Sequence, residues 1–191
     1  MMITYDTHVK PFGKSFQLIE IDKSTIKRID EFAKSIINEK RKESHHQIDN
    51  KAHYKRYYTG TLGEAALEKY LNVTGIIDWS IGNSIKYHQP DLKGIGINAG
   101  IKTVDYGLFP VVFKKSFSSE VIMIRWKDRF VYICGLATPD IIHKYQSLDL
   151  IKDPRLRSRG VKTGFYGFEH LKKFNSIDEL KALTKKNKKY F

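Results

Sequence analysis

The chain has 191 residues, with 34 Lys and Arg against 21 Asp and Glu, and a net charge of +13. This length fits a single domain, and a hydrophobic content of 41% is enough to build a core, which excludes wholesale disorder. The single cysteine, Cys134, excludes an intrachain disulfide and a zinc site built from cysteines.

A small protein this basic usually has an anionic partner. Nucleic acid is the first candidate and an anionic membrane the second, while a lysine-rich proteome without a special partner is the third explanation. The first ten residues lack an apolar signal core, and no run approaches the roughly 20 apolar residues of a membrane span. We therefore expect a cytoplasmic protein that does not enter a membrane.

The first predicted elements are a strand and a helix. Alternation of apolar and polar residues over 15–21 predicts the strand. From Ser24, apolar residues recur at helical spacing through Ile37, which predicts the helix. Its charged end, residues 39–43, is interpreted as a solvated face, with contact to DNA as the alternative.

A polar connection is predicted over residues 44–58. Lys55 and Arg56 are interleaved there with tyrosines, a mixture that binds phosphates and stacks on bases. The equal alternative is a surface loop whose tyrosines pack on the core. The three histidines of this segment lack other ligands at zinc-like spacing, and they predict no metal site.

A second helix is predicted to begin at Thr59 or Thr61, either of which can cap it. Gly63 allows another backbone to approach closely. Glu64 lies in the first turn beside an apolar face, where a carboxylate needs a partner such as a metal or a lysine. The alternative is a first-turn glutamate that only favours the helix dipole.

Two short strands joined by a glycine turn at residues 98–100 are predicted within residues 85–104. Pro90 precedes Asp91 on the first strand, and Lys102 lies on the second. Because paired strands lie about 4.8 Å apart, an acid and a lysine on adjacent strands can meet at one point. Such a pair suits a divalent metal beside a water that must lose a proton.

The second half of the chain predicts more strands and two helices. A strand over residues 111–113 ends in a lysine pair, and residues 121–126 and 130–134 form a predicted hairpin. One helix is predicted from Thr138 and a last one from Ser176. Between them, residues 152–164 predict a flexible basic loop that follows a phosphate backbone, or else a solvated loop.

The order of these motifs resembles the PD-(D/E)XK nuclease superfamily. The resemblance covers roughly residues 59–145 and is carried by Gly60-x-x-Gly63-Glu64 opening a helix, Pro90-Asp91 and Gly100-Ile101-Lys102. It implies an α/β fold in which helices flank a mixed central β-sheet, a restriction-endonuclease-like core. The activity it implies is hydrolysis of phosphodiester bonds in DNA with Mg²⁺, or Mn²⁺, as the cofactor.

The resemblance also implies the parts of the domain and the roles of its residues. One nuclease-like domain, 1–191, would comprise a helical extension (1–58), the core (59–145) and a basic loop with a C-terminal helix (146–191). Asp91 and Glu64 would hold the metal with the backbone carbonyl of Ile101, and Lys102 would act on the attacking water. Residues expected to bind nucleic acid are Lys55, Arg56, Lys114, Lys115, Arg155, Arg157, Arg159 and Lys162.

Gly100 departs from the family, whose members usually carry an acid two positions before the lysine. Three interpretations follow: Glu64 replaces the missing acid, the position carries an inactivating change, or the protein is a binding-only descendant. We favour the first. The alternative function is thus a non-catalytic nucleic-acid-binding protein, and an unrelated basic structural protein is a third hypothesis. Cutting both strands would favour a homodimer, and a stand-alone domain fits a phage or mobile-element enzyme.

Overall fold

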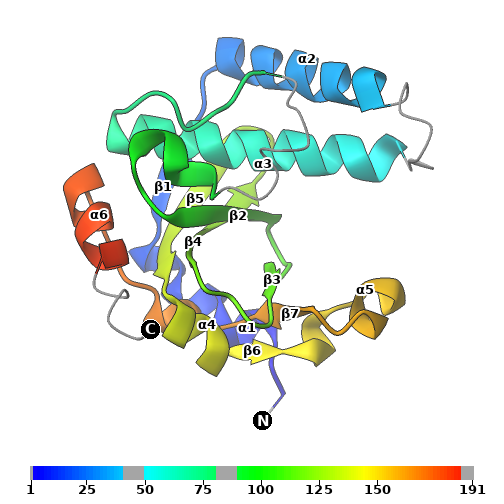
Figure 1. Cartoon of the computed structure of the whole chain (residues 1–191), viewed down its shortest axis with the longest axis vertical. Helices are drawn as coiled ribbons and strands as arrows, with labels where there is room; N and C mark the ends of the chain where they lie inside the picture. Colours follow the sequence, from blue (N-terminus) through cyan, green and yellow to red (C-terminus); the bar gives the residue numbers. More distant parts are fainter. Residues whose placement is uncertain (1, 41–49, 81–89, 186–191) are drawn as a thin grey trace.

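A computed structural model describes residues 2–40, 50–80 and 90–185 as a mixed α/β fold (Figure 1). The larger sheet has the strand order β1-β5-β4-β2, formed by Gln17–Glu20, Phe130–Ala137, Ser119–Trp126 and Ala99–Asp105. It is mixed, because β2 and β4 are parallel while β4, β5 and β1 are antiparallel neighbours. The predicted mixed sheet flanked by helices is confirmed, as are its predicted hairpin and the strand at 15–21.

A smaller antiparallel sheet has the order β3-β7-β6, formed by Val111–Phe113, Lys162–Phe165 and Gln146–Ser147. The chain leaves β2, forms β3 in this smaller sheet and returns to the larger sheet as β4. Parallel strands need such a crossover, because a tight turn can join only antiparallel neighbours. The two sheets are therefore linked by two connections, one from β2 to β3 and one from β3 to β4.

The larger sheet has an apolar core on each face. Alternate residues of β4 belong to different cores, with Val121 and Met123 on one side and Ile122 and Ile124 on the other. This explains why β4 reads as a continuous apolar run instead of alternating with polar residues. The first core is closed by α2 (Lys23–Lys40), α3 (Asn50–Leu71) and α6 (Ile177–Lys185).

The second core is shared with the smaller sheet, and short helices close it. These helices are α1 (Tyr5–His8), α4 (Pro139–Lys144), η1 (Lys10–Ser15) and η5 (Phe168–His170), while η4 (Leu148–Leu150) packs on β7 through Leu150. Cys134 is fully buried there, as expected of a small core residue. None of the helices within the described residues is long and apolar enough to cross a membrane.

Helix α3 corrects two sequence-based predictions. The polar connection expected up to residue 58 is helical from Asn50 onward, so α3 runs through the expected start of the core. Thr59 and Thr61 are buried inside this helix and do not cap it. The error arose because the tyrosines and cations of residues 53–58 hid the helical period. Two of the three histidines, at 45 and 46, lie outside the described residues.

Gly63 is where α3 touches the sheet. A Cβ atom at this position would lie 1.8 Å from Oγ1 of Thr103 and 3.0 Å from Cε of Met123. A close approach at this glycine is therefore confirmed, although the neighbours are side chains of β2 and β4 and not the backbone that we expected. It sets the depth at which α3 packs on β2 and β4, and thus the position of Glu64, the next residue.

We expect Gly63→Ala to destabilise the fold by about 1–3 kcal/mol, the usual cost of overpacking a core. Gly60→Ala in the same helix is the matched control, because a Cβ there meets nothing within 4 Å. Alanine is the better helix former, so the control should gain about 0.5–1 kcal/mol. Urea denaturation of both variants measures the difference. Equal stability of the two would contradict the packing role of Gly63.

The segment around Asp91 also differs from its prediction. Asp91 begins the 3-10 helix η3 (Asp91–Ile95) and does not lie on a strand, while β2 begins at Ala99, so Gly100 is a strand residue and not part of a turn. Pro90 does precede it as the helix cap. The first strand expected around residue 85 falls on residues 81–89, which lie outside the described residues.

The basic segment after residue 152 is more ordered than a flexible loop. It contains the short helix α5 (Pro154–Ser158) and then β7. Asp153 caps α5 by accepting a hydrogen bond from the backbone N–H of Arg155. β7 pairs with β3, and this pairing carries Lys162 to the position opposite Phe113.

Candidate active site

Asp91 lies beside β2, the last strand in the order of the larger sheet within the described residues. Its Oδ2 accepts a hydrogen bond of 2.6 Å from the backbone N–H of Ile101 on β2, the edge strand. The N–H and C=O of one strand residue point to the same side. The carbonyl of Ile101 therefore faces the same edge as Asp91, where no strand within the described residues pairs with β2.

Lys102 reaches the same edge from the strand. Its Nζ lies 3.3 Å from the carbonyl oxygen of Ile101 and 3.5 Å from Oε2 of Glu120 on β4. The Lys102 side chain is 31% exposed, whereas that of Glu120 is only 6% exposed. A buried acid and a half-buried lysine thus share one face of the sheet, next to Asp91.

Glu120 occupies the place where the resemblance leads us to expect an acid. The register pairs Gly100 with Glu120, and a Cβ on Gly100 would lie 2.2 Å from Oε2 of Glu120. Any larger residue at position 100 would displace this carboxylate. The neighbouring strand therefore places an acid next to Gly100, whereas Glu64, which we expected to replace the missing acid, lies on the α3 side of β2.

Sequence reasoning missed Glu120, although a signal was present. It is the only charged residue in Ser119-Glu120-Val121-Ile122-Met123-Ile124, a run that is otherwise buried and almost entirely apolar. A buried carboxylate is costly unless a cation or a hydrogen-bond donor compensates it. An acid inside such a strand is for that reason a candidate site residue.

The electrostatics of Glu120 are those of an incompletely satisfied acid. Burial raises the pKa of its carboxyl, the positive charge of Lys102 lowers it, and the negative charge of Asp91 raises it again. Within the described part of the chain, Oε2 has no hydrogen-bond partner. The lysine therefore compensates the acid only in part, and a further cation would be favourable here.

Glu64 approaches Asp91 from the other face of the sheet. It lies on α3, directly after the glycine that touches Thr103, whereas Lys102 and Glu120 lie on the opposite face. Burial, and to a smaller extent the negative charges of Asp91, Glu68 and Asp78, raise the pKa of Glu64 to about 8. Asp91 thus lies between the buried Glu120 on one face and the partly exposed Glu64 on the other.

The donor set suits a hard divalent cation, which prefers oxygen ligands. The orphaned Oε2 of Glu120, Asp91 and the carbonyl of Ile101 supply oxygens around the edge of β2. No three His, Cys, Asp or Glu side chains in the described ranges form a metal-binding group by themselves. An ion here would therefore combine carboxylates with the backbone carbonyl and water, as Mg²⁺ commonly does.

Three of the expected nucleic-acid-binding residues, Arg56, Arg159 and Lys162, form a cluster of positive charge with Lys102 that centres on Lys162. Burial lowers the pKa of Lys162, and the positive charges of Arg56, Lys102 and Arg159 lower it further. These four cations come from α3, β2, β7 and the turn before β7. The structure thus brings together cations that lie as far apart as residues 56 and 162.

The other expected cations are placed differently. Lys55 forms a 2.5 Å ion pair with Asp105, which also accepts a hydrogen bond from Arg125. Asp105 faces the α3 side of β2, because residues at an odd offset from Lys102 point to the opposite face of the strand. The remaining four are surface residues, of which Arg155 and Arg157 pair with nearby aspartates and Lys114 and Lys115 follow β3.

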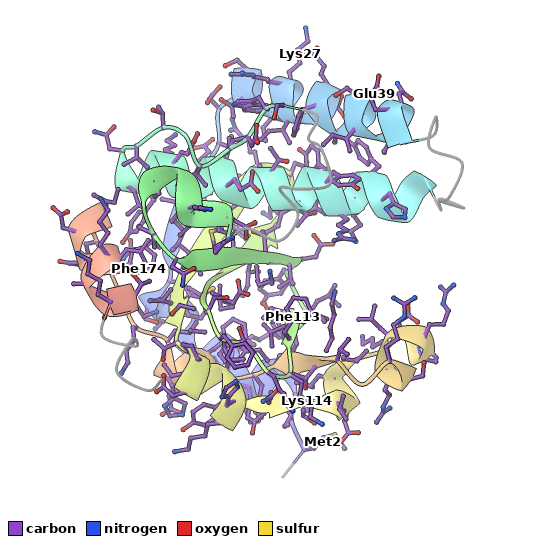
Figure 2. All side chains as sticks on the ribbon, viewed as in Figure 1. Met2, Lys27, Glu39, Phe113, Lys114 and Phe174 are labelled. Carbon is purple, nitrogen blue, oxygen red and sulfur yellow. The ribbon has the colours of Figure 1, made fainter. Side chains whose placement is uncertain are left out.

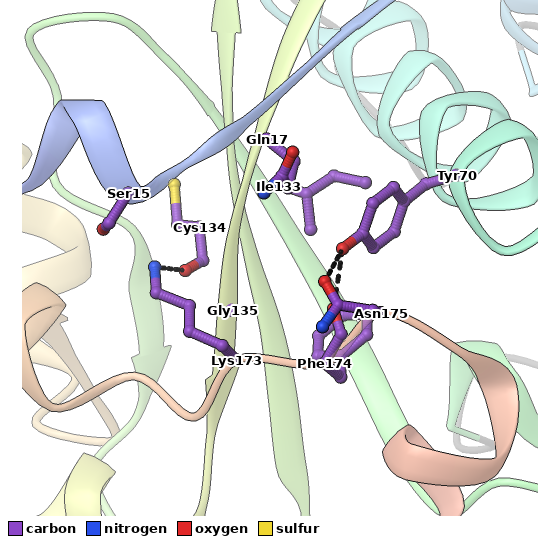
Figure 3. A pocket seen from close by; sticks show the side chains of 9 residues that line it. All are labelled: Ser15, Gln17, Tyr70, Ile133, Cys134, Gly135, Lys173, Phe174 and Asn175. Carbon is purple, nitrogen blue, oxygen red and sulfur yellow. Dashed lines mark hydrogen bonds between the residues drawn. The ribbon is translucent and has the colours of Figure 1, made fainter.

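A separate pocket lies at the opposite end of the larger sheet, where β5 meets the segment before α6 (Figure 3). Nζ of Lys173 donates to the backbone carbonyl of Cys134 at 2.7 Å, and the Tyr70 hydroxyl donates to the carbonyl of Phe174. These contacts engage its lysine and its tyrosine within the wall, and none of the lining residues is an acid. The pocket therefore does not compete as a candidate active site.

Comparison of the chain with protein-family models, curated proteins and solved structures finds no match.

Proposed function

We propose that the protein is a metal-dependent nuclease that hydrolyses phosphodiester bonds in DNA, built on a restriction-endonuclease-like core. The observation that carries this proposal is the carboxylate of Glu120 above Gly100, beside Lys102 and next to Asp91. It supplies the acid whose absence was the main objection to the sequence resemblance. The acid is contributed by a different strand at the same place.

Asp91, Glu120 and the carbonyl of Ile101 would hold Mg²⁺ or Mn²⁺, with Glu64 supporting Asp91 from the α3 face. When bound, the metal lowers the pKa of a coordinated water and neutralises charge on the phosphate. Asp91 is held in place by the N–H of Ile101, so its carboxylate is positioned before any ion or substrate arrives.

Lys102 supplies the remaining chemistry of the strand. Its ammonium lies between the carbonyl of Ile101 and the carboxylate of Glu120, where it would orient the attacking water and stabilise negative charge developing on the phosphate. Arg56, Arg159 and Lys162 would bind phosphates that flank the cleaved bond. Concentrated positive charge of this kind makes binding weaken steeply as salt increases.

The direct test is plasmid cleavage with Mg²⁺ or with EDTA, using the wild type, Asp91→Ala and Lys102→Ala. We expect the wild type to nick DNA only with the metal and both variants to lose this activity. Circular dichroism shows whether the variants fold. Folded variants that cleave as well as the wild type would refute the proposal.

A non-catalytic nucleic-acid-binding protein on the same fold is the second candidate. It is favoured by the finding that the described acids do not form a three-ligand group by themselves. It shares the cluster of Lys102, Arg56, Arg159 and Lys162, and so it also predicts salt-sensitive binding. It is distinguished by the absence of nicking with any divalent metal.

A further inference from the structure

Residues 113–118, which we call the aromatic loop, connect β3 to β4 beside the candidate active site. Phe113 is 51% exposed and Phe117 is 70% exposed, with the exposed Lys114 and Lys115 between them. Figure 2 labels Phe113 and Lys114 where β3 ends. Exposed phenyl rings cost free energy in water, and apolar groups rimmed by cations are typical of a binding surface.

Phe113 is linked to the site through Lys162. The register of β3 and β7 places these two residues opposite each other, and Nζ of Lys162 lies 5.3 Å from the centre of the Phe113 ring. The positive charge of Lys102 also lowers the pKa of this lysine, which shows that the two side chains lie near each other. One cation therefore lies within reach of both the exposed ring and the catalytic lysine.

Phe117 is linked to the site through the chain. It precedes Glu120 by three residues, and an extended chain advances at most about 3.6 Å per residue. Its Cα therefore lies within about 11 Å of the Cα of Glu120. The loop that bears both rings thus leads directly to Glu120, the acid next to Gly100.

We propose that the aromatic loop stacks on unpaired bases next to the cleaved phosphate, so that the substrate class is nucleic acid with single-stranded bases at the cut. This inference rests on the proposed function. In an intact duplex the faces of the bases are covered by their neighbours, and a ring can reach a face only where a base is unpaired. Phenyl rings have no hydrogen-bonding atoms, so this stacking does not discriminate between bases.

The cations near the two phenyl rings indicate which kind of partner the aromatic loop binds. Lys114 and Lys115 lie within the loop, and Lys162 and Arg159 lie beside it on the smaller sheet and the turn before it. Aromatic side chains along a positively charged surface are the arrangement that binds single strands, the cations contacting the backbone and the rings the bases. An anionic membrane is the competing partner for exposed rings and lysines.

The test is binding in EDTA, where cleavage cannot contribute. Fluorescence anisotropy compares a single strand, a blunt duplex and a duplex with a single-stranded flap, each with the full-length protein. We expect the wild type to bind the single strand and the flap at least about fivefold more tightly than the duplex. The double variant Phe113→Ala/Phe117→Ala should lose this preference while keeping its duplex affinity, a loss within the range of base–aromatic stacking.

Two controls separate stacking from general apolarity. Phe117→Trp keeps an aromatic surface and should retain the preference. Leu18→Ala removes an exposed apolar side chain, 43% exposed, from β1 at the opposite edge of the larger sheet, and should change nothing. A 2-aminopurine base in the single strand should be quenched by the wild type and not by the double alanine variant.

Equal wild-type affinity for single strand and duplex would overturn the inference, as would an equal loss on both in the double variant. Sedimentation of the wild type with anionic vesicles in a manner that depends on Phe113 and Phe117 would assign the loop to a membrane instead. The nicking assay with Asp91→Ala reports on cleavage alone. Failure of the nuclease proposal and failure of the base-stacking inference are therefore distinguishable.

Discussion

Glu120→Gln should reduce metal-dependent cleavage at least about a hundredfold, because an acid that holds the metal contributes several kcal/mol to the transition state. Glutamine has nearly the same shape and cannot supply the negative charge. The substitution leaves the packing of β4 intact, and thermal unfolding can verify this. Single-turnover cleavage of a labelled oligonucleotide measures the effect.

The position of the acid can be tested by moving it between strands. In the double variant Gly100→Glu/Glu120→Gly, the carboxylate is moved from β4 to β2, two residues before Lys102. The loss of the Glu120 side chain leaves room for the new glutamate at position 100. We expect this variant to recover cleavage to within about tenfold of the wild type. The backbone at position 100 tolerates a side chain, because it is not among the glycines with positive φ.

Gly100→Ala provides the steric control for the exchange. Its Cβ would lie 2.2 Å from Oε2 of Glu120, so it should displace the carboxylate and impair cleavage. In the Glu120→Gln background the same substitution should add little, since residues that act together are not additive. A Glu120→Gln variant that cleaves at the wild-type rate would exclude Glu120 from the site.

Glu64 should make the protein less stable as the pH rises through neutrality. Its pKa of about 8 in the folded state lies above the value of about 4.3 for an unperturbed glutamate. The folded protein therefore binds a proton that the unfolded chain releases between these two values. Its stabilising contribution is complete below about pH 4.3 and is lost as the pH rises through about 8.

Glu64→Gln should abolish this dependence, because glutamine remains neutral at every pH. At pH 8 we expect the variant to be more stable than the wild type by about 2 kcal/mol, less than the full pKa difference implies, because the side chain is partly exposed. Urea denaturation in EDTA at pH 5, 6, 7 and 8 measures it. The difference between the two proteins removes the contribution of all other groups.

Glu31→Gln is the matched control, since Glu31 is a surface glutamate of α2 whose side chain is 63% exposed. This substitution should leave the pH dependence of the wild type unchanged. Parallel curves for the wild type and Glu64→Gln across this pH range would show that Glu64 is already ionised in the folded protein.

Local patterns were sufficient for many elements. The β4–β5 hairpin, the strand at 15–21 and the helix from Ser24 were predicted because their apolar residues recur with a clear period. The start of α3 was missed because tyrosines and cations obscure that period over residues 53–58. The 3-10 helix at Asp91 was missed because a Pro-Asp pair before apolar residues fits a strand equally well.

The sequence by itself indicated that Asp91, Ile101 and Lys102 lie close together, because only ten residues separate Asp91 from Ile101, although Asp91 makes the contact from a 3-10 helix and not from a paired strand. It also determined that the protein is strongly basic. Only the tertiary structure decided that Glu120 lies next to Gly100 and that Arg56, Lys102 and Arg159 lie near Lys162. Those neighbours depend on the parallel pairing of β2 with β4 and on the crossover through the smaller sheet. Such long-range pairing depends on packing over the whole domain, and no local pattern of residues records it.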